Sequence, residues 1–414
     1  MDNVTHSIVG LAAGELVHRA LPEEKDVDRQ RMRRKLLLMS SWLASNVPDL
    51  DLVLTPLLPA PLGYLLHHRG HTHTLLYSIP QALLIWGAIW VLWPSARRLL
   101  KESASARRGF AISLIVGLII HLLMDYLNSY GLHPFHPFDS RWIYGDMVFI
   151  VEPLFWVALG VPLVMTIRRQ WLKGLLLFSL IGALSFFTLA GFLSWMSLSL
   201  LALLALALGI AQHKAATGGT AALVLAVTVS IGFVGVQNMA SRKARALITA
   251  DAENRDVSSE VLDISLNSFP SNPVCWIFIS IESKESAGFY RLRRGVLSLV
   301  PEMLPVSKCP AGFLERPHQL EATSAIALLS EQKDSLDSIR RLRAENCYFE
   351  AWLRFARAPS ISESQASDMR FDFAQRENFT TIDLEELKNR DCSPYVPGWG
   401  FPRADLLDTP PVQE

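Results

Sequence analysis

The sequence predicts an all-α, polytopic membrane helical bundle followed by a C-terminal soluble α+β domain. Half of the 414 residues are hydrophobic and 19% are charged, which is below the roughly 25% of an average soluble domain. Apolar runs of membrane-spanning length fill residues 74–238. Charged residues, prolines and glycines become frequent again from about residue 241. The first part is therefore expected to lie in the lipid bilayer and the second part in water.

Six apolar segments are expected to span the membrane, because a helix needs roughly 20 apolar residues to cross the hydrocarbon core. They are residues 74–94, 110–128, 148–168, 174–194, 196–212 and 219–238. Two shorter apolar stretches, 5–20 and 36–47, precede them and are expected to be tilted, half-inserted or packed inside the bundle. A charged loop from Glu23 to Lys35 separates these two stretches.

The distribution of Lys and Arg among the short loops predicts the orientation of the chain. Loops 21–35 and 95–109 hold six and five basic residues, whereas loops 48–73 and 129–147 hold one each. With the basic loops in the cytoplasm, the chain is expected to be a multi-pass membrane protein. Loops 48–73 and 129–147 then share the outer side.

The region beyond residue 241 contains strand-like runs at 274–281, 348–356 and 369–373 and a helix-like run at 321–345. Alternation of the spanning segments places this domain on the outer side, although three basic residues directly after the last segment argue against it. The four cysteines all lie here, and none forms a Cys-x-x-Cys pair, so a cysteine zinc site is not expected. The sequence leaves open whether the four cysteines form two disulfides or remain four free thiols.

Histidines gather at the start of the chain, where nine of the eleven lie within the first 136 residues, close to carboxylates. The predicted orientation brings these groups to one membrane face. His121 and Asp125 have the i, i+4 spacing that puts both on one side of a helix, about 6 Å apart at Cβ. Imidazole together with carboxylate suits a divalent ion such as zinc, or manganese or iron, better than calcium.

Each group alone has an ordinary structural explanation. An isolated helical histidine is usually a satisfied core residue, and Asp49-x-Asp51 could cap a helix. The pair His121-x-x-x-Asp125 is more specific, because both side chains are costly in an apolar segment unless they are paired or coordinated. Convergence on one face therefore favours a metal site. Its expected ligands are His6, Asp49, Asp51, His68, His73, His121 and Asp125.

Four motifs and a following Gly and Pro-Phe element occur in a fixed order: Thr5-His6, Pro48-Asp49-x-Asp51, His68-Arg69-Gly70-x-Thr72-His73, His121-x-x-x-Asp125, Gly131 and Pro137-Phe138. They resemble the bacterial inner-membrane metal-dependent hydrolases, also called LexA-binding, inner-membrane-associated hydrolases. The resemblance covers about residues 1–160 and implies a metal-site, hydrolase-like membrane domain there, in a multi-pass protein of the cell inner membrane. The apolar runs add further transmembrane helices at 161–240, and the composition predicts a soluble α+β domain at 241–414. His71 falls at a variable position of the family pattern and ranks below the neighbouring histidines.

The leading hypothesis is a membrane-embedded, metal-dependent hydrolase of phosphoester or lipid-linked substrates. A bound metal would lower the pKa of water and polarise the ester oxygen. The His/Asp arrangement is also similar to zinc-dependent phospholipase C and single-strand nucleases, which favours phosphoesters over peptides. Arg69 is expected to stabilise developing negative charge, and Asp146 or Glu152 to act as a base or to support the ligands.

Two other functions stay open: a metal-ion transporter and a non-catalytic sensor or docking protein. Intramembrane His and Asp also mark ion pathways, but segments 174–238 hold almost none. The family name implies a repressor-protein partner, which would be cytoplasmic and so opposite the motif loops. The other expected partners are membrane lipids and a small-molecule or lipid substrate. Equal numbers of basic and acidic residues, 39 each, give no sign of a nucleic-acid partner.

Overall fold

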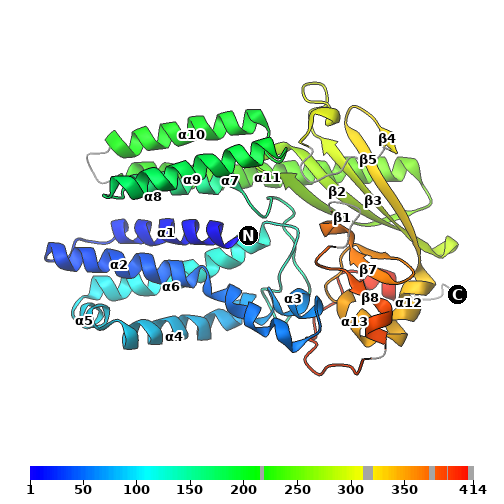
Figure 1. Cartoon of the computed structure of the whole chain (residues 1–414), viewed down its shortest axis with the longest axis horizontal. Coiled ribbons are helices and arrows are strands. Elements are labelled where there is room, and N and C mark those ends of the chain that lie inside the picture. Colours follow the sequence, from blue (N-terminus) through cyan, green and yellow to red (C-terminus); the bar gives the residue numbers. More distant parts are fainter. Residues whose placement is uncertain (215–218, 311–319, 373–377, 389, 409–414) are drawn as a thin grey trace.

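A computed structural model describes residues 1–214, 219–310, 320–372, 378–388 and 390–408. A helical bundle occupies one end of the molecule and a domain built on an antiparallel sheet occupies the other (Figure 1). The first helix starts in the middle, where the two parts meet. This architecture confirms the predicted helical N-terminal part and C-terminal α+β domain.

The long helices of the bundle are α1 (Asn3–Ala20), α2 (Val27–Ala44), α4 (Leu75–Leu92), α6 (Ala104–Tyr126), α9 (Gln170–Leu189), α10 (Trp195–Lys214) and α11 (Thr220–Arg255), with shorter α3 (Leu62–His67) and α5 (Pro94–Glu102). Within the described residues, α4, α6, α9, α10 and α11 are long and apolar enough to cross a membrane. The expected span at 148–168 is shorter than predicted. Its helix, α7 to α8 with one π turn, covers only Pro153–Met165. Pro153 begins it, and the Glu152 side chain caps it by accepting from the Leu154 amide.

The two short N-terminal stretches pack inside the bundle against α6. Glycines allow this close approach: a Cβ on Gly10 would lie 2.0 Å from the Ser45 Oγ, and one on Gly117 would lie 2.6 Å from the Ala44 Cβ. Nine of the thirteen residues of the expected charged loop from Glu23 to Lys35 are helical, because α2 already begins at Val27. At about 1.5 Å per residue, both helices reach roughly 27 Å, close to the thickness of the hydrocarbon core.

The main sheet of the C-terminal domain is antiparallel with the order β1-β2-β3-β5-β4. Its strands are β1 (Glu260–Phe269), β2 (Asn272–Lys284), β3 (Phe289–Ser298), β4 (Glu321–Ala322) and β5 (Ile326–Ser335), followed by α12 (Leu336–Glu345), α13 (Cys347–Leu353), β6 (Pro359–Ile361), β7 (Gln365–Asp368), β8 (Ile382–Asp383), α14 (Leu384–Lys388) and α15 (Ala404–Leu407). Helix α11 runs from the bundle through residue 241 onto this sheet, where Ala244 and Ile248 pack against Ile264 and Trp276. One continuous helix therefore connects the two parts.

The four secondary-structure predictions for this domain have different outcomes. The strand at 274–281 is confirmed within β2. The strand at 348–356 is wrong, because the Asn346 side chain accepts from two following amides and starts α13. The strand at 369–373 is a 3-10 turn over Met369–Phe371, and Phe373 lies outside the described residues. The helix predicted at 321–345 is confirmed only from Leu336 onward, where α12 begins. The preceding residues Ile326–Ser335 belong to β5, which pairs with β3.

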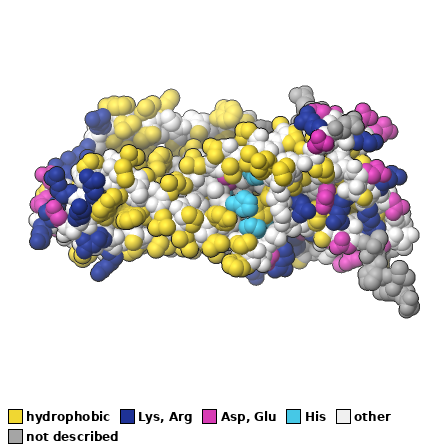
Figure 2. Space-filling model, turned by 90° about the horizontal axis from the view of Figure 1, so that it is seen from below, with side chains coloured by type: hydrophobic (Ala, Val, Ile, Leu, Met, Phe, Trp, Pro, Cys, Tyr) yellow, Lys and Arg dark blue, Asp and Glu magenta, His cyan; other side chains and the backbone are white. Residues whose placement is uncertain are grey.

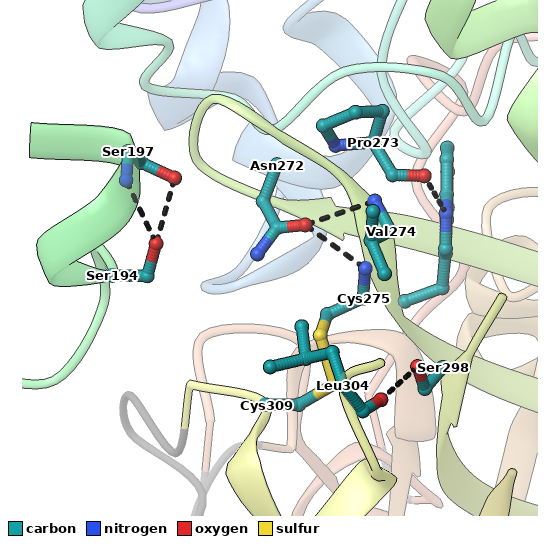
Figure 3. Close-up of a disulfide and its surroundings, with 10 residues drawn as sticks. Ser194, Ser197, Asn272, Pro273, Val274, Cys275, Ser298, Leu304 and Cys309 are labelled. Carbon is teal, nitrogen blue, oxygen red and sulfur yellow. Dashed lines mark hydrogen bonds between the residues drawn. A yellow bond between two sulfur atoms is a disulfide. The ribbon is translucent and has the colours of Figure 1, made fainter. Parts of the chain in front are cut away.

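All four cysteines form disulfides, Cys275–Cys309 and Cys347–Cys392. Figure 3 shows the first, which ties the start of β2 to the loop that follows β3. Lys and Arg gather at the end of the bundle farthest from this domain (Figure 2). The basic loops and the disulfides thus lie at opposite ends of the molecule.

A continuous hydrophobic core joins the domain to the bundle and includes Leu66 and Trp142 from the bundle and Trp352 and Trp399 from the domain. Two indole groups donate across the boundary: Trp399 Nε1 to the Leu66 carbonyl at 2.8 Å, and Trp142 Nε1 to the Arg354 carbonyl at 2.6 Å. The domain therefore covers the end of the bundle that carries the histidine motifs.

Candidate metal centre

Four side chains converge where the bundle meets the C-terminal domain: Asp49, His73, His121 and Asp125. Each offers one ligand atom, and these atoms all lie within 4.8 Å of one another. Asp49 belongs to the 3-10 helix η1 (Val47–Leu57) and His73 to the 3-10 helix η2 (His71–His73), while the other two come from α6. All four are buried, so their polar atoms need partners.

The spacing of the four groups fits a tetrahedral ion. The Nε2 atoms of His73 and His121 are 3.0 Å apart. Asp125 Oδ2 lies 3.2 Å from the first of these nitrogens and 3.4 Å from the second. Asp49 Oδ1 lies 3.3 Å and 3.7 Å from the same two atoms. Ligands about 2 Å from a central zinc in a tetrahedron stand about 3.3 Å apart, which is the middle of the range of these five distances. The sixth distance, between the two carboxylates, is within 4.8 Å.

The tautomers of the two imidazoles are set by their other nitrogens. His121 Nδ1 donates to the Ser45 carbonyl at 2.8 Å, and His73 Nδ1 donates to Asp51 Oδ2 at 3.1 Å. Because Nδ1 carries the hydrogen in each neutral ring, both Nε2 atoms present lone pairs. In this neutral form the two Nε2 atoms, 3.0 Å apart, can both bind one cation.

Asp51 organises the loop that supplies His73. Its Oδ1 accepts from His68 Nδ1 at 3.0 Å, and its Oδ2 accepts from the Arg69 amide at 3.0 Å, from Thr72 Oγ1 at 2.8 Å and from His73 Nδ1 at 3.1 Å. Arg69 has a left-handed φ of 58°, which turns the chain so that these donors face one carboxylate. Burial raises the pKa of Asp51, but the histidine hydrogen bonds outweigh it and hold the pKa below its usual range.

Comparison with known proteins supports a membrane role for this part of the chain. The model of the YdjM inner membrane protein family matches residues 1–240. The chain belongs to the YdjM inner membrane protein family. All four converging side chains lie in the region that the family model matches. The predicted membrane-bound family is thereby confirmed, whereas hydrolysis and repressor binding stay predictions.

A distant relative of this YdjM family member occurs in Bacillus subtilis (strain 168) and is described as uncharacterized protein YfhP. It is 26% identical over 158 residues, which is 38% of the present chain and 44% of the relative. The alignment thus spans less than half of the relative's length. No solved structure matches the chain.

Among the other expected ligands, His6 lies beside the four residues, whereas Asp51 and His68 lie one layer out. His6 Nε2 is 3.3 Å from Asp125 Oδ1, and its ring stacks on His121 with centroids 4.1 Å apart. The amino group of Met1 also contacts Asp125. The structure therefore gathers all seven expected side chains, but in two layers.

Arg69 contacts the centre through Asp125. Its Nη2 lies 2.9 Å from Asp125 Oδ1, and its Nη1 donates to Asn128 Oδ1 at 3.0 Å. The guanidinium also stands 4.6 Å from the centroid of the Tyr130 ring. Sequence reasoning missed Asn128 and Tyr130, as well as the Ser45 carbonyl. Only Asn128 had a signal, because it follows Asp125 by three residues at the same helix end.

The structure does not bring Asp146 or Glu152 to the centre, which corrects their expected catalytic or supporting role. Both Asp146 oxygens accept from Arg357 at 2.8 Å, and Arg245 binds the same carboxylate. Glu152 accepts from the amide and the hydroxyl of Ser271. Both carboxylates therefore bind residues of the C-terminal domain, and Asp146 also binds Arg245 of α11, so these contacts hold the domain against the bundle.

Four further histidines of the N-terminal region, His67, His71, His133 and His136, do not belong to the converging group. Three of their rings surround Trp399, with centroid distances of 4.2 Å for His133, 4.7 Å for His136 and 4.8 Å for His71. Histidine side chains reach the surface where the apolar bundle meets the charged domain (Figure 2). These residues extend the boundary between the two parts.

Proposed function

We propose that this YdjM family member is a membrane-embedded, metal-dependent hydrolase of phosphoester or lipid-linked substrates. The observation that carries the proposal is the close approach of the His73 and His121 Nε2 atoms, 3.0 Å apart, with carboxylate oxygens of Asp49 and Asp125 at 3.2–3.7 Å from them. Such a buried set of two imidazoles and two carboxylates suits zinc, with manganese or iron as alternatives.

A bound ion would lower the pKa of a coordinated water toward neutrality and polarise a phosphoryl oxygen. The chain's own groups prepare the site for this chemistry. Asp51 and the Ser45 carbonyl hold the two imidazoles in the tautomer that binds a cation. Arg69 has the planar guanidinium that suits a phosphoryl group, and its Nε has no partner within the described part of the chain.

His68 replaces Asp146 and Glu152 as the proposed proton acceptor. Its Nδ1 is held by Asp51 at 3.0 Å, so its Nε2 is the free nitrogen. Its ring centroid lies 5.7 Å from that of His73, and its side chain is half-buried at the edge of the centre. A histidine oriented by a carboxylate in this way is suited to general acid–base work.

The proposed placement is a multi-pass inner-membrane protein with the centre and the C-terminal domain on the outer side. Two features support it. Lys and Arg gather at the end of the bundle that would face the cytoplasm, and the C-terminal domain at the other end holds two disulfides, which persist in an oxidising compartment. Of the three basic residues after the last span, two have partners within the protein: Arg245 binds Asp146 and Asp263, and Lys243 donates to the Leu299 carbonyl. Reporter fusions after residues 60 and 140 should be active on the same, non-cytoplasmic side, and a fusion at residue 103 on the other. Opposite sides for 60 and 140 would contradict the placement.

The transporter alternative has less support. Within the described residues, no second group of three or more metal-binding side chains lies along α9, α10 or α11. An ion would therefore find no chain of ligands across the bundle. The repressor partner implied by the family resemblance is cytoplasmic and would lie on the side opposite to the proposed centre. Repressor binding is therefore not part of the proposed function.

Metal analysis of the purified full chain, followed by an assay with bis(p-nitrophenyl) phosphate, tests the proposal. We expect stoichiometric zinc, or manganese or iron, and turnover that stops after chelation and returns with the metal. Bound metal without turnover of any phosphoester would favour a sensor. Metal flux in proteoliposomes would favour the transporter.

A further inference from the structure

A cavity of about 340 Å³ lies between the bundle and the C-terminal domain. Its volume falls within the range of small-molecule binding sites. The bundle contributes most of its aromatic wall through the end of α9 and the residues that follow it, and the chain before α7 adds further apolar side chains. The bundle wall includes Phe149, Val151, Phe186, Phe187 and Phe192. Phe371 and Phe379 close the cavity from the C-terminal domain.

One end of the cavity reaches the metal centre through Asn128 and Tyr130, which both line it. Asn128 Oδ1 accepts from Arg69, and the Tyr130 ring lies against the same guanidinium, which in turn binds Asp125. Both residues are almost fully buried, at 2% and 4% exposure. The Asn128 Nδ2 and the Tyr130 Oη have no hydrogen-bond partner among the described residues. Because buried donors without partners cost free energy, they suit the oxygen atoms of a ligand.

The cavity also borders the apolar outer surface of the bundle. Phe186 lines the cavity and is 64% exposed. It belongs to α9, one of the helices that are long and apolar enough to cross a membrane. The lining of the cavity is therefore continuous with a surface that suits contact with lipid chains.

We propose that this cavity binds one hydrocarbon chain of an amphiphilic phosphoester, with the polar headgroup directed toward Arg69 and the metal centre. An aromatic, apolar wall that includes two unpartnered donors is complementary to an amphiphile, whose hydrocarbon chain covers the wall while its headgroup oxygens accept from the donors. Cleavage of the bound ester rests on the proposed function. Binding of the chain rests on the cavity alone.

Photocrosslinking of the full chain in vesicles of phosphatidylethanolamine and phosphatidylglycerol tests the binding. The probe is phosphatidic acid with a diazirine at the end of one acyl chain, and crosslinks are mapped by mass spectrometry. We expect crosslinks on the peptides that carry Val151 and Phe187. Val151→Trp and, from the opposite wall, Asn267→Phe fill the cavity and should lower these crosslinks about tenfold. The matched control is Leu83→Trp on α4, which is 60% exposed and lies outside the cavity.

Crosslinks confined to the exposed faces of the spanning helices in the unmodified chain would overturn the proposal, whether or not the variants fold. Turnover of bis(p-nitrophenyl) phosphate separates this result from failure of the proposed function, because that soluble ester needs the centre but not the cavity. Retained turnover with no cavity crosslinks leaves a hydrolase without the chain site. Cavity crosslinks with no turnover by the metal-loaded protein leave the chain site without the hydrolase.

Discussion

Replacing Asp51 by Asn separates a metal ligand from a residue that orients ligands. The carboxylate accepts four hydrogen bonds, two of them from histidine Nδ1 atoms, and an amide keeps only one acceptor oxygen. His73 would then lose the partner that keeps its hydrogen on Nδ1. Loss of such a supporting group typically weakens metal binding 10–100-fold, or by roughly 1.4–2.7 kcal/mol.

The assay is zinc competition against a chromogenic chelator, with stoichiometry measured by elemental analysis. We expect Asp51→Asn to bind one equivalent with this lower affinity. Asp139→Asn is the matched control, because Asp139 contacts Arg141 at the exposed surface and should leave affinity unchanged. Complete loss of metal from Asp51→Asn would show that Asp51 is itself a ligand, as its position in the sequence first suggested. Unchanged affinity would refute the role of its hydrogen bonds.

The remaining predictions concern the ligands and the docking of the C-terminal domain. His121→Ala and Asp125→Asn should each remove bound metal and activity while the protein stays inserted, and His213→Ala, outside the centre, should change neither; full metal in both variants would remove the core of the proposal. Arg357→Gln should lower the free energy of unfolding by about 1.5–3 kcal/mol, measured in denaturant, because Asp146 and Asp263 lose their hydrogen bonds to the guanidinium and keep only the ion pairs with Arg245 and Arg403; a loss within the error of the measurement would contradict this. Burial raises the pKa of Glu152 from 4.5 to about 7, so the folded state holds a proton that the unfolded state releases. Stability should therefore fall by up to roughly 3 kcal/mol as the pH rises through this interval, and Glu152→Gln should abolish that slope.

The sequence alone was sufficient for features that depend on local composition and spacing. Runs of apolar residues located the five described helices that are long enough to span a membrane, because the thickness of the bilayer sets their length. Loop charges predicted that the motifs would meet at one end. The i, i+4 spacing placed His121 and Asp125 on one face of α6, and their Nε2 and Oδ2 atoms lie 3.4 Å apart.

Tertiary structure decided what depends on partners far away in the chain. The sequence could not show that Asp51 orients His68 and His73 without being one of the four converging residues. That role depends on two histidine donors, 17 and 22 residues later in the chain, that meet the same carboxylate. Nor could the sequence show that Asp146 pairs with Arg357, which is 211 residues later. Local propensity likewise suggested a strand at 348–356, where the Asn346 cap and packing of aromatic residues stabilise a helix instead. In each case the deciding hydrogen bond or contact forms only after distant segments have packed, so the local sequence does not contain it.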